Sequence, residues 1–166
     1  MELTEAPWKI YLDEAAPADP VARFSDHVLE CRAFLARVPA DKATYRYAPE
    51  KWSVKELVGH ITDADLIFLY RLICIARGET KSLPGFDENT YARNGRFDSA
   101  DWDTQLQAHR SVSDAALALI RGLDAQAWNC RGTANNVGLT SLEMLRVFMG
   151  HERHHLRILR ERYALA

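Results

Sequence analysis

The histidines near the end of the chain have the spacing of a metal site. His151, Glu152 and His155 form the pattern H-E-x-x-H in the stretch MGHERHHLRILRERYALA. Histidines four positions apart lie on one face of a helix, so both imidazoles could bind one metal ion while the glutamate handles a proton. Zinc-dependent peptidases carry this pattern, with their third ligand further downstream.

The third ligand of such a site is expected upstream in this chain. The extended peptidase pattern needs glycine at position 158 and histidine at position 161, where this sequence has Ile158 and Glu161. Only eleven residues follow His155. We therefore expect no peptidase activity, and we expect another helix to supply the third ligand.

Three further histidines could supply that ligand. His60 belongs to the apolar face of a predicted helix and should point inward. His27 is flanked by acidic residues and His109 lies in the polar stretch QAHRSVSD, so we expect both to face solvent. The predicted metal ligands are thus His60, His151 and His155. A His60 that only packs in the core is the alternative left open.

Two carboxylates are candidates for proton transfer at this site. Asp63 lies one turn after His60, and Glu152 lies at the flank of the ligand face. A carboxylate in either place is more often a partner of a ligand histidine or a surface charge, and that reading stays open. His154 lies about 80° from the ligand face and is expected to contact solvent or one of the metal-binding side chains, not the metal ion itself. Four aromatic residues either wall a pocket or pack loops onto the helices: Trp8, Tyr11, Phe86 and Tyr91.

The helical period organises the rest of the sequence. Ser53 with Glu56, and Thr140 with Glu143, form capping boxes, and Asp19 is expected to cap the first helix. Four stretches combine helix start signals with an apolar face, namely 19–38, 53–78, 101–122 and 140–163. Strand-like alternation is weak throughout. We predict an all-α four-helix bundle with long loops between helices, whose core is a usual place for metal sites.

Composition limits the classes of partner. The 166 residues suffice for one domain, 1–166, and the net charge of −2 gives no excess positive field for nucleic acid. The longest apolar runs are short and split by Arg71, so no membrane span is predicted. The acidic start of the chain does not look like a signal peptide, and three widely spaced cysteines suit a reducing compartment. We expect a cytoplasmic protein.

Three segments, in this order and spacing, resemble the DinB/YfiT-like superfamily of small bacterial proteins: YAPEKWSVKELVGHITDAD, LPGFDENTYAR and VFMGHERHHLRILRERY. The resemblance implies an up-down-down-up bundle and a divalent metal ion, zinc or nickel, held by His60, His151 and His155. With a rise of about 1.5 Å per residue, the three histidines lie at more similar heights along the bundle if the two helices that carry them are antiparallel than if they are parallel.

Three imidazoles would leave at least one metal position open, where a water or a thiolate could bind. The resemblance implies metal-dependent hydrolases and thiol S-transferases that use low-molecular-weight thiols. We expect a small-molecule thiol S-transferase or hydrolase, with transfer preferred. A non-catalytic protein with a structural or sensory metal is the alternative. The expected partners are a small-molecule substrate, a low-molecular-weight thiol and a second copy of the chain in a homodimer.

Overall fold

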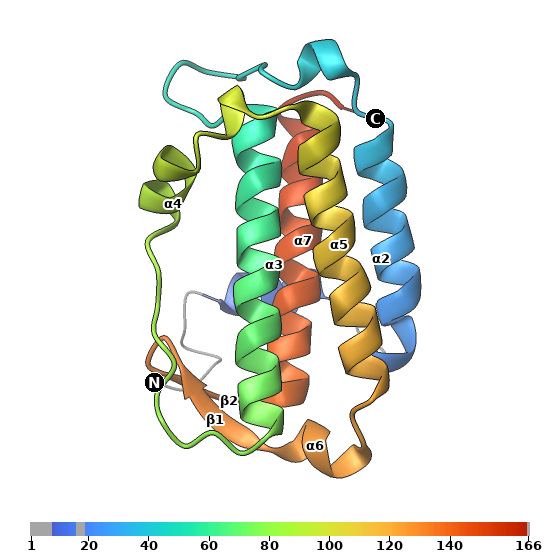
Figure 1. The fold of residues 1–166 in the computed structure, drawn as a ribbon, viewed down its shortest axis with the longest axis vertical. Coiled ribbons are helices and arrows are strands. Elements are labelled where there is room, and N and C mark those ends of the chain that lie inside the picture. Colours follow the sequence, from blue (N-terminus) through green and yellow to red (C-terminus); the bar gives the residue numbers. More distant parts are fainter. Residues whose placement is uncertain (1–7, 16–18, 166) are drawn as a thin grey trace.

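Four long helices form the body of the molecule. The structure is a computed structural model that describes residues 8–15 and 19–165. The long helices are α2 (Pro20–Ala36), α3 (Val54–Ala76), α5 (Trp102–Arg121) and α7 (Ser141–Glu161). Helices α2 and α7 run one way and α3 and α5 the other, which is the up-down-down-up order (Figure 1). The predicted four-helix bundle is confirmed.

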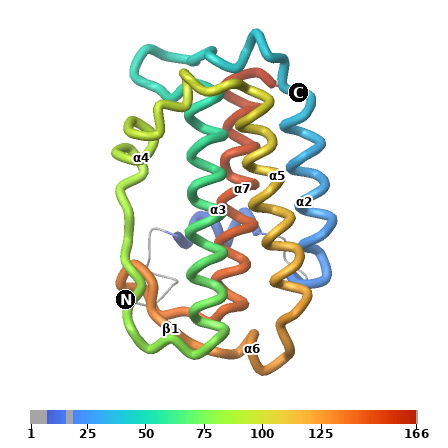
Figure 2. The backbone as a smooth tube through the Cα atoms, in the orientation of Figure 1, coloured from blue at the N-terminus to red at the C-terminus, as the bar shows by residue number. Residues whose placement is uncertain are grey.

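Shorter elements connect the long helices. They are α1 (Lys9–Glu14), η2 (Ala40–Lys42), α4 (Glu88–Gly95), η3 (Phe97–Ser99), α6 (Ala125–Asn129), β1 (Arg131–Ala134) and β2 (Val137–Thr140). The connection with α4 climbs along α3 from one end of the bundle to the other (Figure 2). Strands β1 and β2 pair antiparallel, with Ala134 opposite Val137. Neither the short helices nor this hairpin follows from the sequence signals that predict the long helices.

The predicted caps explain where the long helices begin. The Asp19 side chain accepts hydrogen bonds from two backbone amides of α2. Both predicted capping boxes are formed, Ser53 with Glu56 at α3 and Thr140 with Glu143 at α7. These interactions satisfy amides that have no partner inside the helix. The local sequence therefore determines where α3 and α7 begin, and these two helices carry the candidate ligands.

The core consists of two apolar clusters separated by a polar layer. One cluster packs the hairpin end of the bundle around Phe68 and Phe148, and the other packs the opposite end around Leu57 and Leu159. Along each long helix, buried polar residues lie between the members of the two clusters. This mid-bundle polar layer comprises His27, His60, Asp65, His109, His151, Glu152 and His155.

Helix α1 packs against the middle of α7, beside this layer (Figure 1). The approach is close at Gly150, where an added Cβ would lie 1.7 Å from the carbonyl oxygen of Tyr11. Glycine is needed there because any side chain would overlap the α1 backbone. The contact places Trp8 and Tyr11 next to the histidine pair of α7. None of the helices in the described ranges is long and apolar enough to span a membrane.

Candidate metal centre

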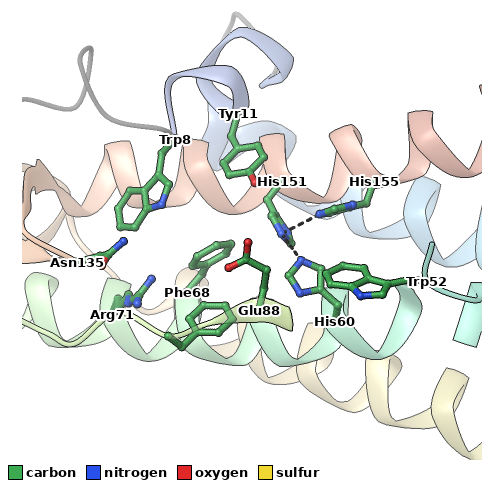
Figure 3. Close-up of a pocket in the computed structure, with 11 residues that line it drawn as sticks. Trp8, Tyr11, Trp52, His60, Phe68, Arg71, Glu88, Asn135, His151 and His155 are labelled. Carbon is green, nitrogen blue, oxygen red and sulfur yellow. Dashed lines mark hydrogen bonds between the residues drawn. The ribbon is translucent and has the colours of Figure 1, made fainter. Parts of the chain in front are cut away.

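The imidazoles of His60, His151 and His155 meet in the polar layer. Helix α3 supplies His60, and one turn of α7 supplies the other two (Figure 3). The Nε2 atom of His151 lies 3.0 Å from Nε2 of His60 and 3.1 Å from Nε2 of His155. All three side chains are buried. The structure thus brings the three predicted ligands together, each through the same ring nitrogen.

The arrangement fits a divalent transition metal ion. Zinc–nitrogen bonds of about 2.0–2.1 Å in tetrahedral geometry separate two ligand nitrogens by roughly 3.3 Å, close to the spacing found here. One metal ion would accept all three Nε2 lone pairs. Hydrogen bonds between neighbouring rings could not satisfy all three converging nitrogens at once. Ligation through Nε2 places the ring proton on Nδ1. Imidazole donors suit zinc and nickel alike.

Electrostatics keep these rings in the form that binds metals. Burial lowers the pKa of His60 to about 4. Burial first, and the neighbouring imidazoles second, hold the pKa values of His151 and His155 well below the usual value. At neutral pH the three rings are therefore uncharged and their lone pairs are free for a metal ion.

The cluster forms one end of a cavity of about 390 Å³. Its wall combines side chains from α1, α3 and α7 with residues of the loops, α4 and the hairpin (Figure 3). The lining residues are Trp8, Tyr11, Trp52, His60, Phe68, Arg71, Phe86, Glu88, Asn135, His151 and His155. Trp8, Tyr11 and Phe86 were among the aromatic residues expected at a pocket. Tyr91 instead packs on Phe86 and is largely exposed.

A buried cation lies at the end of the cavity away from the histidines (Figure 3). The Arg71 guanidinium donates a 2.6 Å hydrogen bond to the carbonyl oxygen of Pro84 and lies over the rings of Trp8 and Phe86. In the part of the chain that the structure describes, no carboxylate lies within ion-pair distance of Arg71. In the sequence, Arg71 stands out only as a break in an apolar run.

The other candidate side chains lie away from the cavity. Asp63 is half-buried on α3, and burial raises its pKa. Glu152 is buried and turned toward α2 and α5 rather than toward the three histidines. His154 contacts Glu14 and Arg157 at the edge of α1. Neither Asp63 nor Glu152 lines the cavity, so their catalytic roles stay predictions without support from the geometry.

The expectation for His27 and His109 is wrong. Both side chains are 2% exposed, and both contact the carboxylate of Glu152, at 2.7 Å and 3.3 Å respectively. Charged sequence neighbours suggested solvent, but adjacent residues lie on different faces of a helix. The residues three before and four after His27 are Phe24 and Cys31, which are buried and would have indicated the correct face.

An up-down-down-up bundle with a three-histidine cluster beside a cavity defines the class of protein. Residues 24–159 match the family model of the DinB superfamily. The chain therefore belongs to the DinB superfamily, as the three segments of its sequence indicated. A search of curated protein sequences finds no match.

Several solved structures share the fold. YfiT from Bacillus subtilis, described as a probable metal-dependent hydrolase with an unusual four-helix bundle topology, aligns with a TM-score of 0.76 and 18% identity over 92% of this chain and 93% of its own. A mycothiol-dependent maleylpyruvate isomerase aligns with a TM-score of 0.65 and 16% identity over 95% of this chain and 62% of its own. A DinB-like protein from Bacillus subtilis aligns at 0.61 and 17% identity, covering 89% and 93%. At these identities the likeness shows the fold alone.

Proposed function

We propose that this protein is a metal-dependent enzyme that acts on small molecules, with zinc or nickel held by His60, His151 and His155. The observation that carries the proposal is the convergence of three neutral Nε2 atoms at the wall of a cavity. Structural zinc sites are usually closed by four protein ligands, whereas catalytic sites keep a position open. Among the described residues, the cluster offers three protein ligands and faces the cavity.

The bound ion would act as a Lewis acid toward a thiol or a water in the cavity. The chain itself holds the three nitrogens in place. Trp52 packs on the His60 ring at a centroid distance of 4.8 Å, and Phe68 meets His151 edge-on at 5.1 Å. These contacts fix the imidazole planes, and a cavity of this volume admits a ligand of small-molecule size.

Thiol transfer is the preferred reaction. A thiolate that is activated at the open position needs no side-chain base, which suits a cavity whose carboxylate is Glu88 and which neither Asp63 nor Glu152 lines. The mycothiol-dependent isomerase that shares this fold supports a low-molecular-weight thiol as the second substrate. Hydrolysis is the second candidate, supported by the description of YfiT as a probable metal-dependent hydrolase.

The Arg71 end of the cavity favours a substrate with an anionic substituent, whereas the Glu88 carboxylate, which also lines the cavity, would repel an anion placed close to it. Among the described residues, the Arg71 guanidinium donates one side-chain hydrogen bond, to Pro84, and the histidine cluster lies at the other end (Figure 3). A planar carboxylate matches the guanidinium fork. Such a substrate would place its reacting carbon toward the histidines while its carboxylate contacts Arg71.

Peptidase chemistry is not proposed, despite the H-E-x-x-H pattern. In that chemistry the glutamate acts as general base beside the metal ion. Here Glu152 contacts His27 and His109 on the opposite side of α7. The two histidines of the pattern line the cavity, whereas the glutamate of the pattern does not.

The metal assignment is tested by measuring bound metal in single variants. His60→Ala, His151→Ala and His155→Ala should each lower zinc and nickel affinity at least tenfold. His154→Ala is the matched control, because His154 is adjacent to a ligand but belongs to the α1 contact. Equal metal affinity in all four variants would contradict the assignment.

The reaction class is tested with metal-loaded protein. We expect conjugate formation from an electrophile that carries a carboxylate and at least one of several low-molecular-weight thiols. Turnover of esters or amides without conjugation would favour hydrolysis. The absence of both reactions across a broad panel would support a non-catalytic, structural or sensory metal protein.

A further inference from the structure

A second group of buried polar side chains lies in the polar layer, on the side of α7 away from the cavity. Asp65 of α3, His109 of α5 and Glu152 of α7 each point one ligand-type atom at the others, with all three atoms within 4.8 Å of one another. Their side chains are 2% exposed. We call these three residues the Asp65 cluster. None of them lines the cavity with the three histidines.

The spacing within the Asp65 cluster is too wide for tight hydrogen bonding. Nε2 of His109 lies 3.3 Å from Oε1 of Glu152 and 3.7 Å from Oδ2 of Asp65. Charge-assisted N–H···O bonds are shorter, about 2.7–2.9 Å. Ligand atoms about 2.1 Å from a common ion are separated by roughly 3.0–3.4 Å, depending on the coordination geometry. The 3.3 Å separation between His109 and Glu152 matches a coordination shell, whereas Asp65 would have to move slightly closer to His109 to share the same ion.

Among the described residues, one buried oxygen of the cluster is left without a hydrogen-bond partner. Oδ1 of Asp65 is buried and has no hydrogen-bond partner among the described residues. A buried carboxylate oxygen in that state is costly unless a cation or proton serves it. An ion bound by both oxygens of Asp65, Nε2 of His109 and Oε1 of Glu152 would remove this cost and complete four ligand atoms.

The charge of the cluster also calls for a cation. Among the described residues, no lysine or arginine lies within ion-pair distance of Asp65 or Glu152, whose carboxylates pair only with histidines. Burial and the negative charge of Glu152 hold the pKa of Asp65 well above its usual value, so without a cation this carboxyl keeps its proton, and a bound divalent ion would displace that proton. A divalent ion would neutralise both carboxylates at once.

The surroundings orient Glu152 for this role. His27 of α2 donates from Nε2 to Oε2 of Glu152 at 2.7 Å, which leaves Oε1 directed at His109. Nε of Arg153 donates to Nδ1 of His27 at 3.4 Å, so Nδ1 acts as the acceptor and Nε2 is the nitrogen that donates to Glu152. Outer hydrogen bonds of this kind commonly fix a carboxylate ligand.

We propose that Asp65, His109 and Glu152 bind one divalent metal ion of hard to borderline character, such as Mn²⁺ or Zn²⁺, separate from the three-histidine site. Two carboxylates and one imidazole form a donor set suited to such ions. Because the ligands come from three helices and line no cavity, the ion has a structural role and ties α3, α5 and α7 together at mid-height.

The test removes the first site and asks whether a second remains. In the variant His60→Ala/His151→Ala/His155→Ala, titration with Zn²⁺ followed by calorimetry, and with Mn²⁺ followed by electron paramagnetic resonance, should show one bound equivalent. Adding Asp65→Asn should weaken that binding at least tenfold. Asp63→Asn, two residues away on the same helix and off the cluster, is the matched control and should leave it unchanged.

A second comparison keeps the proposal testable if the triple variant fails to fold. In the otherwise unchanged chain, Asp65→Asn should bind one equivalent fewer than Asp63→Asn, with circular dichroism confirming the fold of both. Equal stoichiometry in these two proteins, or a folded triple variant that binds no metal, would overturn the proposal. The cluster would then be a network of hydrogen bonds with a proton on Asp65. Neither result bears on the three-histidine site, whose own variants test it separately.

Discussion

At the scale of single residues, His151 and Glu152 are neighbours in the chain but belong to different centres. Successive helical residues are about 100° apart, so one faces α3 and the cavity while the other faces α2 and α5. The two environments act on pKa in opposite directions. Burial and nearby imidazoles keep His151 neutral, whereas His27 and His109 keep Glu152 ionised. One turn of α7 therefore offers neutral nitrogen on one side and anionic oxygen on the other.

Arg71 gives a prediction at this scale. Arg71→Met should keep the packing against Trp8 and Phe86 but remove the buried cation. The free energy of unfolding should stay within about 1 kcal/mol of wild type or rise, because an unpaired buried charge is costly. Affinity for a dicarboxylate probe should fall at least tenfold by calorimetry. Unchanged affinity would show that Arg71 has no role in substrate recognition.

Local signals in the sequence predict some of the site residues and miss others. The three candidate ligands were found because the spacing of the pair and the apolar face of His60 are local signals. Arg71 was missed because its function depends on loops that fold over it, and the assignment of His27 to solvent was wrong because acidic neighbours concealed the buried face of α2. Spacing of three and four residues, rather than adjacency, carries the usable signal.

At the scale of elements, the four long helices were predictable and the short ones were not. Caps and periodicity define α3 and α7 within a few residues. Helices α1 and α6 have 6 and 5 residues, too short for an apolar period to show, and isolated helices of that length are unstable in water. Asn135 and Asn136 adopt positive φ angles in the hairpin turn, and an Asn-Asn pair is a weaker signal than Asn-Gly.

Docking of α1 depends on Gly150, and this gives a second prediction. Gly150→Ala replaces a poor helix former, and the higher helix propensity of alanine should stabilise α7 by about 1 kcal/mol. The added Cβ, however, would overlap the backbone of Tyr11. We expect α1 to detach while the bundle stays folded. Limited proteolysis should then cleave before residue 19 at least tenfold faster, with metal content unchanged.

The matched control for Gly150→Ala is Gly138→Ala, since an added Cβ at Gly138 meets no atom within 4 Å. Its cleavage rate should equal that of wild type. Identical rates for the two variants would mean that α1 tolerates a side chain at position 150.

A third prediction concerns pH. Glu14, at the end of α1, accepts hydrogen bonds from Arg157 of α7 at 2.6 and 3.0 Å and lies 3.7 Å from His154. The hydrogen bond from Arg157 is the main cause that lowers the pKa of Glu14 below its usual value of 4.5. A carboxyl group with a depressed pKa stabilises docking above its ordinary pKa, and that contribution is lost as pH falls through the lowered value.

Fluorescence of Trp8 can follow this loss. The difference between wild type and Trp8→Phe isolates the Trp8 signal, which should shift toward a solvent-exposed spectrum as pH falls below the usual glutamate pKa of 4.5. Glu14→Gln should show weaker docking at neutral pH and no matching step on acidification. The same step in both proteins would assign it to other groups.

At the scale of the whole molecule, the polar layer divides the apolar core at mid-height. Each long helix contributes at least one member, so the layer fixes how the helices are aligned along the bundle. Sliding one helix by a turn would bury these groups against apolar side chains without partners, which is costly. The two apolar clusters supply the stability, and the layer between them supplies the alignment.

Metal removal gives the prediction at this scale. A ligand present at a hundredfold excess over its dissociation constant stabilises the folded state by about 2.7 kcal/mol. For a chain of this size, that corresponds to a rise of roughly 5–10 °C in Tm. Chelation should therefore lower Tm by at least this amount, and His155→Ala should lose the part of the effect that comes from the three-histidine site. A melting curve that does not respond to metal in the wild-type protein would contradict the proposed site.

The cavity wall has two sources. Long helices supply the three histidines, whereas Trp8, Phe86 and Asn135 come from the start of α1, a loop and the hairpin turn. Substitutions in these segments would change which molecule fits the cavity without moving the three candidate metal ligands. Affinity for metal and choice of substrate can thus evolve as separate traits on this scaffold, and an engineer could redesign one while leaving the other intact.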